Sequence, residues 1–242
     1  MILNGAVIIP ARFQSTRFAG KPLVDIHGKP MIQHVYERSV EAVGSDFVHV
    51  ATDSDEIQSA VKGFGGSVIR TSETCLTGTD RIAEANKVLG ADFIVNVQGD
   101  EPMVNPCDIK TVFLAMQKDS SRVINCYCEI EDWERGMASV PKVVVSQGQK
   151  LLYMSRAGIP FDKKLKSHAF FKQVCIYGFS NQHLDLFSRQ SGKTENEIHE
   201  DIELLRFLDI DIPVQMVKVL GGSHAVDTPQ DLERVIAIMA DT

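Results

Sequence analysis

Short, continuous apolar runs alternate with helix-like patterns through the first hundred residues, and this order most constrains the fold. The runs that we expect as strands are residues 6–10, 47–52, 67–71 and 92–98, and the expected helices are residues 29–43, 55–64 and one that starts near Thr79 or Asp80. Strands that are apolar throughout, rather than at alternate positions, are typical of parallel sheets covered on both faces. The pattern therefore predicts an α/β fold with a doubly wound, mostly parallel sheet, which binds ligands at the carboxyl ends of its strands.

From about residue 122 the pattern changes to strand-like segments with little helix between them. We expect strands at 122–130, 142–146, 150–156 and 171–179, then a helix at 195–210, a strand at 213–220 and a closing helix at 228–240. No internal repeat, low-complexity tract or linker divides the chain. We therefore expect one domain over residues 1–242, in which residues 122–180 form a β-rich insertion or the arm of a dimer.

Charge and hydropathy exclude several classes of partner. The net charge of −7 argues against nucleic acid or an anionic membrane as the main partner, and the longest apolar runs are only strand-sized. The amino terminus lacks the flanks of a signal peptide, and the five cysteines have no paired spacing. We therefore expect a cytoplasmic protein, in which Cys126 and Cys128 are small buried apolar residues rather than metal ligands.

A basic, glycine-containing loop, "ARFQSTRFAGKPL" (11–23), follows the first strand. Arg12 and Arg17 provide forked donors and Lys21 a compact charge, which together suit phosphate oxygens. Gly20 permits unusual backbone angles in the turn. The spacing fits neither the P-loop nor the dinucleotide-binding fingerprint. Because the loop follows the first strand of a doubly wound sheet, we prefer a phosphate-binding site to a solvated basic loop.

Two further segments place acids where they would face the same crevice. In "VNVQGDEP" (95–102) a buried strand ends just before Asp100, and magnesium prefers one or two carboxylates together with phosphate oxygens and water. In "AVDTPQDLERV" (225–235), Asp227 is by its local pattern a helix start, with Pro229 in the first turn. A second acid is nevertheless what a metal site at Asp100 needs.

The segment "LTGTDRIAEA" (76–85) has a glycine between two threonines before a predicted helix. Its free amides and hydroxyls are an expected site for an anion or the edge of a base. Taken alone, this pattern is common.

Six segments taken together resemble the bacterial CMP-Kdo synthetases, the 3-deoxy-manno-octulosonate cytidylyltransferases, which activate an eight-carbon acid sugar for lipopolysaccharide. The segments are "PARFQSTRFAGKPL", "TGTDR", "VNVQGDEP", "YMSRAGIP", "IYGF" and "VDTPQDLERV", and the resemblance runs from about residue 5 to 238. It implies a fold of the nucleotide-diphospho-sugar transferase type, CTP and an acid sugar as substrates, a requirement for Mg²⁺, a homodimer, and CMP-sugar plus pyrophosphate as products.

The resemblance also implies roles for single residues. Arg12 and Lys21 match phosphate contacts, whereas Asp100 and Asp227 match metal-binding acids, and these four are the expected catalytic residues. The other residues expected to bind substrate are Ala11, Gln14, Ser15, Arg17, Thr77, Gly78, Thr79, Arg81, Gln98, Arg156, Gln173, Tyr177 and Glu203. Of these, Gln98 and the "TGT" segment match positions near the nucleotide and sugar, whereas Arg156 and Glu203 match positions that line the sugar pocket.

The mechanism that this resemblance implies has no covalent intermediate. The anomeric hydroxyl of the sugar attacks the α-phosphorus of CTP in line, and pyrophosphate leaves. Catalysis is then mostly positioning and neutralisation of charge by Arg12, Lys21 and magnesium. We further hypothesise that Asp100 and Asp227 help activate the hydroxyl by way of the ion.

Two departures from the family pattern fall on its sugar side. The usual His before "IYGF" is Gln173, which keeps a hydrogen-bonding group, and the usual Gln in "IELLRFLD" is Leu204, which has none. Alternative acceptors are therefore a modified ulosonate, such as an 8-amino form, or another nonulosonic acid. The residues do not decide between CTP and UTP, and a non-catalytic nucleotide-binding paralogue is a second class of function.

Overall fold

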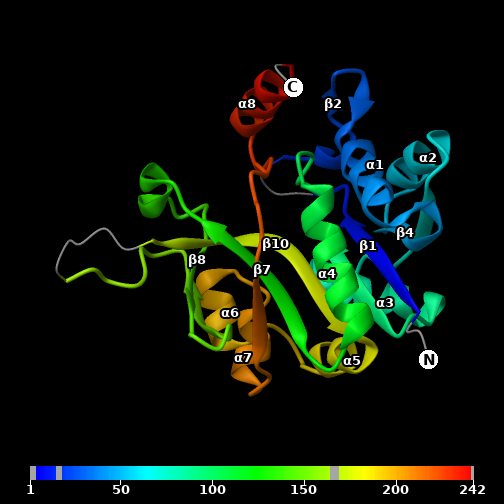
Figure 1. Cartoon of the computed structure of the whole chain (residues 1–242). Helices are drawn as coiled ribbons and strands as arrows, with labels where there is room; N and C mark the ends of the chain where they lie inside the picture. Colours follow the sequence, from blue (N-terminus) through cyan, green and yellow to red (C-terminus); the bar gives the residue numbers. More distant parts are fainter. Residues whose placement is uncertain (1–3, 15–17, 164–168, 241–242) are drawn as a thin grey trace.

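In the computed structural model, which describes residues 4–14, 18–163 and 169–240, one large sheet forms the centre of the molecule (Figure 1). Among these residues the sheet has nine strands, and its main path runs in the order β11-β7-β10-β6-β1-β4-β5. The strands on this path are β1 (Gly5–Ala11), β4 (Val48–Thr52), β5 (Ser67–Arg70), β6 (Phe93–Val97), β7 (Val123–Glu129), β10 (Phe171–Ser180) and β11 (Val214–Lys218). All the predicted strands are confirmed.

The sheet is mostly parallel, as predicted, with β10 as the antiparallel exception on the main path. β1 pairs in parallel with both β4 and β6, and β11 pairs in parallel with β7, whereas β10 runs antiparallel to both β6 and β7. Off this path, β8 (Lys142–Val145) pairs with β10 and with β9 (Leu151–Ser155). In Figure 1, β8 projects to the left, away from the helices that pack against β1. Residues 122–180 therefore supply strands both to the main sheet and to this extension.

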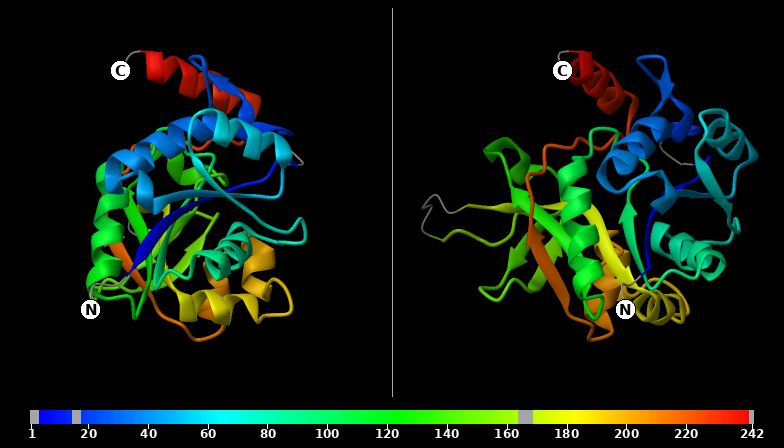
Figure 2. Two further views of the ribbon diagram at one scale, coloured as in Figure 1. Left: turned by 90° about the vertical axis from the view of Figure 1, so that its right-hand side faces the viewer. Right: turned by 45° about the vertical axis from the view of Figure 1, so that its right-hand side comes forward.

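Helices pack on both faces of the sheet (Figure 2). One face is covered by α1 (Met31–Val43), α2 (Asp55–Gly63) and α4 (Pro106–Lys118), and the other by α3 (Gly78–Leu89), α5 (Asn181–Ser188) and α7 (Leu205–Asp209). Alternate side chains of β1 enter the two cores, since Val7 and Ile9 belong to the first and Ala6 and Ile8 to the second. Burial on both faces is the reason that these strands are apolar at every position.

A smaller apolar cluster joins the two ends of the chain. The closing helix α8 (Pro229–Ala240) places Val235 against Ile26, which lies in the short hairpin of β2 (Asp25–Ile26) and β3 (Lys29–Pro30). Figure 1 shows α8 beside β2 at one end of the molecule. This packing brings the segment before α8 close to the loop after β1.

One helix prediction is wrong. Residues 195–210 form two short helices, α6 (Glu195–Glu200) and α7, instead of one, because Asp201 takes a left-handed backbone conformation with φ 50°. Three single-turn 3₁₀ helices complete the elements, η1 (Lys21–Leu23), η2 (Ser45–Phe47) and η3 (Asp132–Gly136). None of the helices in the described part of the chain is both long and apolar enough to cross a bilayer.

Candidate functional site

The main candidate site is a cavity at the carboxyl ends of β1 and β6, where the connections of these two neighbouring strands diverge. The chain leaves β1 toward β4 on one side, and returns through α3 to β6 on the other. Such a switch point opens a crevice in a doubly wound sheet. Arg12 borders the first cavity at the end of β1, and Gln98 and Asp100 border it at the end of β6.

Lys21 joins the two predicted metal-binding acids in this first cavity. Its Nζ lies 2.7 Å from Oδ2 of Asp100 and 3.1 Å from Oδ1 of Asp227. Gly20, with φ 69°, makes the turn that aims Lys21 inward. Burial lowers the pKa of the Lys21 ammonium, but attraction to Asp100 and then to Asp227 outweighs it and leaves that pKa above its ordinary value. The ammonium therefore stays charged between the two carboxylates.

Asp227 reaches the first cavity because the segment before α8 is tied to the loop after β6. The amide of Val226 donates to the carbonyl of Asp100 at 2.9 Å. Thr228 starts the helix, with its hydroxyl 2.8 Å from the carboxylate of Asp231. The helix-start interpretation therefore applies to Thr228, while the Asp227 carboxylate remains directed at Lys21.

The donor set of the site suits a small divalent cation. Asp100 and Asp227 offer carboxylate oxygens that meet at one point, now opposite the Lys21 ammonium. Magnesium binds proteins through one or two carboxylates and completes its shell with water and phosphate oxygens. Within the described residues, no group of three or more His, Cys, Asp or Glu side chains converges as a metal site. The pair therefore fits an ion shared with a phosphate better than one enclosed by the protein.

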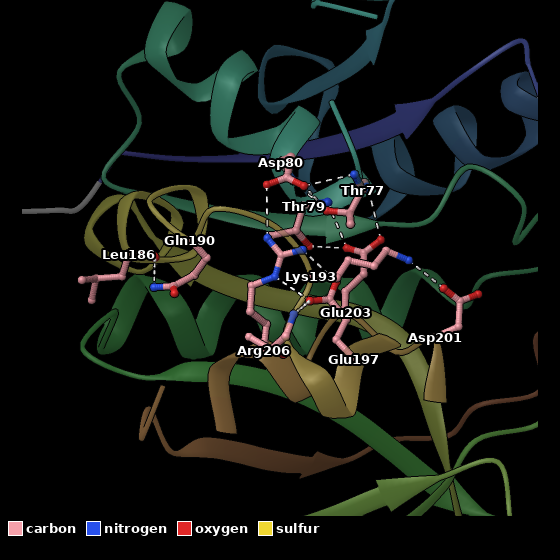
Figure 3. Close-up of polar contacts among 12 residues, drawn as sticks. Thr77, Thr79, Asp80, Leu186, Gln190, Lys193, Glu197, Asp201, Glu203 and Arg206 are labelled. Atoms are coloured by element: carbon pink, nitrogen blue, oxygen red, sulfur yellow. Dashed lines mark hydrogen bonds and ion pairs between the residues drawn. The ribbon is translucent and has the colours of Figure 1, made fainter. Parts of the chain in front are cut away.

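The expectation that the "TGT" amides are free for a ligand is wrong in this structure. The amides of Gly78 and Thr79 each donate to the carboxylate of Glu203 at 3.0 Å, and the Thr79 hydroxyl donates to it at 2.6 Å (Figure 3). The first turn of a helix presents unpaired amides, and a carboxylate satisfies them well. The anion held by this turn is therefore a side chain of the protein itself.

A second buried link holds the same turn. The guanidinium of Arg206 is 1% exposed and makes two bonds to Glu197, at 2.6 and 2.8 Å. Its third nitrogen lies 3.4 Å from Asp80, whose other oxygen accepts from the amide and hydroxyl of Thr77. Burial lowers the pKa of Arg206, but Glu197 raises it more, so that its pKa lies above the ordinary value. Figure 3 shows these contacts converging on the start of α3.

The first cavity gathers most of the predicted residues from distant parts of the chain. Those that line it are Ala11, Arg12, Lys21, Thr77, Gly78, Arg81, Gln98, Asp100, Glu203 and Asp227. Thr79 is 2% exposed and contacts Glu203 instead of the cavity. Gln14 lines a neighbouring hollow, and Ser15 and Arg17 lie outside the described residues.

Arg81 borders the first cavity but is largely used within the fold. Its side chain is 4% exposed and lies 2.6 Å from Asp53, and a second nitrogen donates to the hydroxyl of Thr71 at 2.6 Å. These contacts join α3 to the loops that follow β4 and β5. Arg81 nevertheless lines the first cavity.

Residues matched to the sugar side of the family pattern do not lie together in this structure. Gln173 lines a second cavity, which shares Asp227 with the first, and its amide donates to the hydroxyl of Tyr177 at 3.3 Å. Arg156 lines neither cavity and donates to the carbonyls of Ala138, Glu200 and Asp201. Leu204 is 1% exposed and packs in the core with the side chains of α7.

Two charged residues of the first cavity were not predicted. Lys193 and Asp201 line it and form an ion pair of 2.8 Å at its rim. They flank α6, with Lys193 just before the helix predicted at 195–210 and Asp201 inside it. The pattern gave no sign of the left-handed turn that brings Asp201 to the cavity.

Comparisons with known proteins agree over nearly the whole chain. A family model described as cytidylyltransferase matches residues 6–212. A 3-deoxy-manno-octulosonate cytidylyltransferase of Escherichia coli is 40% identical over 238 residues, which are 98% of this chain and 96% of that protein. An 8-amino-3,8-dideoxy-manno-octulosonate cytidylyltransferase of Shewanella pealeana is 36% identical over 236 residues, covering 95% of this chain and 96% of the relative.

A solved structure also matches nearly the whole chain. It is that of a CMP:2-keto-3-deoxy-manno-octonic acid synthetase complexed with CTP. The match has a TM-score of 0.91 at 39% identity, and it covers 98% of this chain and 99% of the other.

Proposed function

The chain belongs to the cytidylyltransferase family, and we propose that it transfers the cytidylyl group of CTP to 3-deoxy-manno-octulosonate (Kdo) or a close relative, for lipopolysaccharide synthesis. The observation that supports this most directly is Lys21, held between Asp100 and Asp227 at the switch point of the sheet. A cation and two acids in one crevice are the groups needed to bind a metal–triphosphate and to neutralise its charge.

The reaction exchanges one bond to phosphorus for another. The anomeric hydroxyl oxygen of the sugar forms a bond to the α-phosphorus, and the bond from that phosphorus to the bridging oxygen of the β-phosphate breaks. Pyrophosphate leaves with the electron pair of that bond, and the hydroxyl proton passes to solvent water. Arg12 and Lys21 border the first cavity on the side of the basic loop, where they neutralise the departing pyrophosphate. Positioning of the two substrates supplies much of the remaining rate enhancement.

We propose that Asp100 and Asp227 hold Mg²⁺ during this reaction. The ion would supply charge neutralisation at the phosphates and a lower pKa for a bound hydroxyl. With both carboxylates engaged in this way, the Lys21 ammonium becomes available to phosphate oxygens, since Lys21 and the ion use the same two acids.

An 8-amino sugar acid is the second candidate acceptor. Asp201 lines the first cavity and is paired there with Lys193, and a substrate ammonium would compete with Lys193 for this exposed carboxylate. Gln173 provides a neutral hydrogen-bonding group on the same side of the site as Tyr177. Leu204, by contrast, is a core residue and lines neither cavity.

The deciding experiment measures pyrophosphate release with CTP and Mg²⁺ against Kdo, 8-amino-Kdo and sialic-type acids. We expect turnover with Kdo or with its 8-amino form. If CTP binds but no acid sugar supports release, the result favours a non-catalytic nucleotide-binding paralogue or an acceptor outside this panel. Replacement of CTP by UTP in the same assay tests the choice of base.

We also propose that the protein is a cytoplasmic homodimer. All five cysteines are free, which suits a reducing compartment. In the described part of the chain β9 pairs only with β8, and Leu152 on this edge strand is 59% exposed. An uncovered edge strand with an exposed apolar residue is a plausible contact for a second copy. Light scattering coupled to size exclusion tests this, and we expect Leu152→Asp to shift the mass toward the monomer.

A further inference from the structure

The turn that begins α3 is attached to a part of the chain more than a hundred residues away. Thr77 and Gly78 of this turn line the first cavity. The side chains that hold the turn are Glu203, which lies between α6 and α7, and Arg206, which lies in α7. Figure 3 shows both side chains directed at the turn from below. The geometry of one wall of the cavity therefore depends on this distant segment.

The start of α3 does not need these contacts merely to form a helix end. Thr77 and Asp80 already make a complete capping box, in which each side chain accepts from the backbone of the other residue. Glu203 adds a second set of bonds to the next two amides and to the Thr79 hydroxyl. Such additional bonds fix the position of a turn that is already capped.

The buried ion network is a poor source of stability. Arg206 and Glu197 are 1% and 0% exposed, and buried ion pairs commonly contribute no more than apolar residues of the same size. What the network does provide is orientation. The guanidinium stacks 3.7 Å from the ring centre of Phe187, its fork engages Glu197, and its remaining nitrogen contacts Asp80. Arg206 therefore fixes Asp80, and Asp80 fixes Thr77.

The position of the turn matters because Gly78 lies close to the ends of β1 and β6. A Cβ atom at Gly78 would lie 3.4 Å from Pro10 and 3.6 Å from the amide nitrogen of Gln98. A shift of the turn by a fraction of an ångström would therefore change the gap between Gly78 and the ends of β1 and β6. A ligand that fills this gap would be sensitive to such a shift.

We propose that Glu203 and Arg206 are positioning residues, which hold the Thr77–Asp80 turn at the correct distance from Pro10 and Gln98 and so set the affinity for the nucleotide. This rests on the proposed function, in that CTP is taken to occupy the first cavity. In this role Glu203 acts through Thr79 and Gly78. It belongs to the binding wall even though its carboxylate is already occupied by protein donors.

The test uses calorimetric binding of CTP with Mg²⁺, together with separate measurement of KM and kcat. Glu203→Gln puts an amide group opposite the Thr79 donors, so we expect about a tenfold rise in the Kd and KM for CTP. Because Glu203 also lines the first cavity, the deciding readout is the Kd for CTP measured without the acid sugar, and kcat is recorded beside it. Thr79→Val should raise the Kd for CTP by about fivefold. Thr79→Ser, which keeps the hydroxyl, should bind CTP with the Kd of the parent.

A double-mutant cycle separates positioning from direct contact. If Thr79 acts through Glu203, the double variant Thr79→Val/Glu203→Gln binds CTP about as weakly as Glu203→Gln alone. Multiplicative effects of the two changes would mean that each side chain contacts the nucleotide independently, and would overturn the proposal.

The matched control is Ser180→Ala, which removes the cap of α5. It should lower the melting temperature and leave the Kd for CTP unchanged. Unchanged CTP binding in both Thr79→Val and Glu203→Gln would sink the positioning role while leaving the proposed function intact. Absence of CTP binding by the parent protein would instead refute the proposed function.

Discussion

The Lys21 ammonium lies between Asp100 and Asp227, in the position that a metal ion bound by the same two acids would take. Removal of its charge would leave two partly buried carboxylates facing each other, which repel. For Lys21→Met we therefore expect tighter binding of Mg²⁺ in the absence of nucleotide, together with a fall in kcat/KM of about 10²–10³. Magnesium titration calorimetry and the pyrophosphate assay measure the two effects.

Lys21→Arg is the matched variant for this prediction. It keeps the positive charge, so we expect it to retain much more activity than Lys21→Met and to bind Mg²⁺ like the parent. A kcat/KM unchanged in Lys21→Met would remove Lys21 from the catalytic set.

Arg81 illustrates a residue whose predicted role is at least partly structural. Its ion pair with Asp53 is buried, so Arg81→Met leaves that acid without its partner, and we expect a loss of about 3 kcal/mol in the free energy of unfolding. Urea denaturation measures this loss. The control is Arg70→Met, because the Arg70 pair with Asp55 is exposed and should contribute less than about 1 kcal/mol. Equal losses in the two variants would contradict the prediction.

At the residue scale, the sequence predicted which charged residues meet in the first cavity better than it predicted the contacts that form the cavity walls. Each of the three charged residues that meet there, Lys21, Asp100 and Asp227, lies next to the end of a helix or strand that the sequence marks with glycine, proline or a carboxylate. In a doubly wound sheet such ends lie close together at the switch point. The bond from Glu203 to Thr79 spans 124 residues, and no local pattern reports it. For that reason the "TGT" amides were expected to be free.

At the element scale, β6 and β1 approach so closely that only glycine fits between their ends. A Cβ atom at Gly99 would lie 2.8 Å from the carbonyl oxygen of Pro10. Gly99→Ala would therefore push the two strand ends apart, at a cost of about 1–3 kcal/mol in folding free energy. Because Gln98 and Asp100 flank this position, CTP binding should also weaken, which calorimetry would show. A variant that folds and binds CTP like the parent would contradict this account.

The cap of α5 gives a pH-dependent stability. Burial lowers the pKa of His183 below its ordinary value of 6.5, and the imidazole lies 2.8 Å from the Ser180 hydroxyl. As the pH falls through about 6.5 the unfolded chain takes up this proton before the folded one, so the folded state loses stability toward acid. His183→Gln keeps a capping-box partner and does not titrate.

Urea denaturation at pH 7.5 and pH 5.5 tests this. The parent should lose more stability on acidification than His183→Gln does, by up to about 1.4 kcal/mol for each pH unit below 6.5 in which only the unfolded chain is protonated. Replacement of the exposed His199 by Gln is the control. The same acid loss in parent and His183→Gln would exclude this group as the cause.

The strands that were predicted well are those that are buried on both faces of the sheet. Strands buried on both faces are apolar throughout, so their positions could be read from the sequence. The break at Asp201 was missed because the apolar pattern continues across it, with Ile202, Leu204 and Leu205 all buried. Helix α4 was not predicted, although Asn105 and Pro106 are a recognisable cap and first turn.

At the scale of the whole molecule, ligands that bridge the cavity should stabilise the entire fold. The first cavity is bordered by the loop after β1, the loop after β6 and the segment before α8. CTP with Mg²⁺ at about 100 times its Kd should therefore add about 2.7 kcal/mol to the free energy of unfolding. Thermal denaturation with and without CTP, Mg²⁺ and a chelator measures this. Equal stabilisation by CTP in the presence of the chelator would argue against a metal at Asp100 and Asp227.

Strand β10 runs antiparallel to its neighbours, and its residues are separate in the sequence from the other residues of the site. Side chains at the switch point come from the ends of parallel strands, whereas Gln173 and Tyr177 come from the one strand of the main path that runs the opposite way. If Gln173 contacts the acceptor sugar, substitutions at the start of β10 would change the acceptor and leave the segments that contain Arg12, Lys21 and Asp100 unaltered. The specificity for the sugar could then vary while the specificity for the nucleotide is kept.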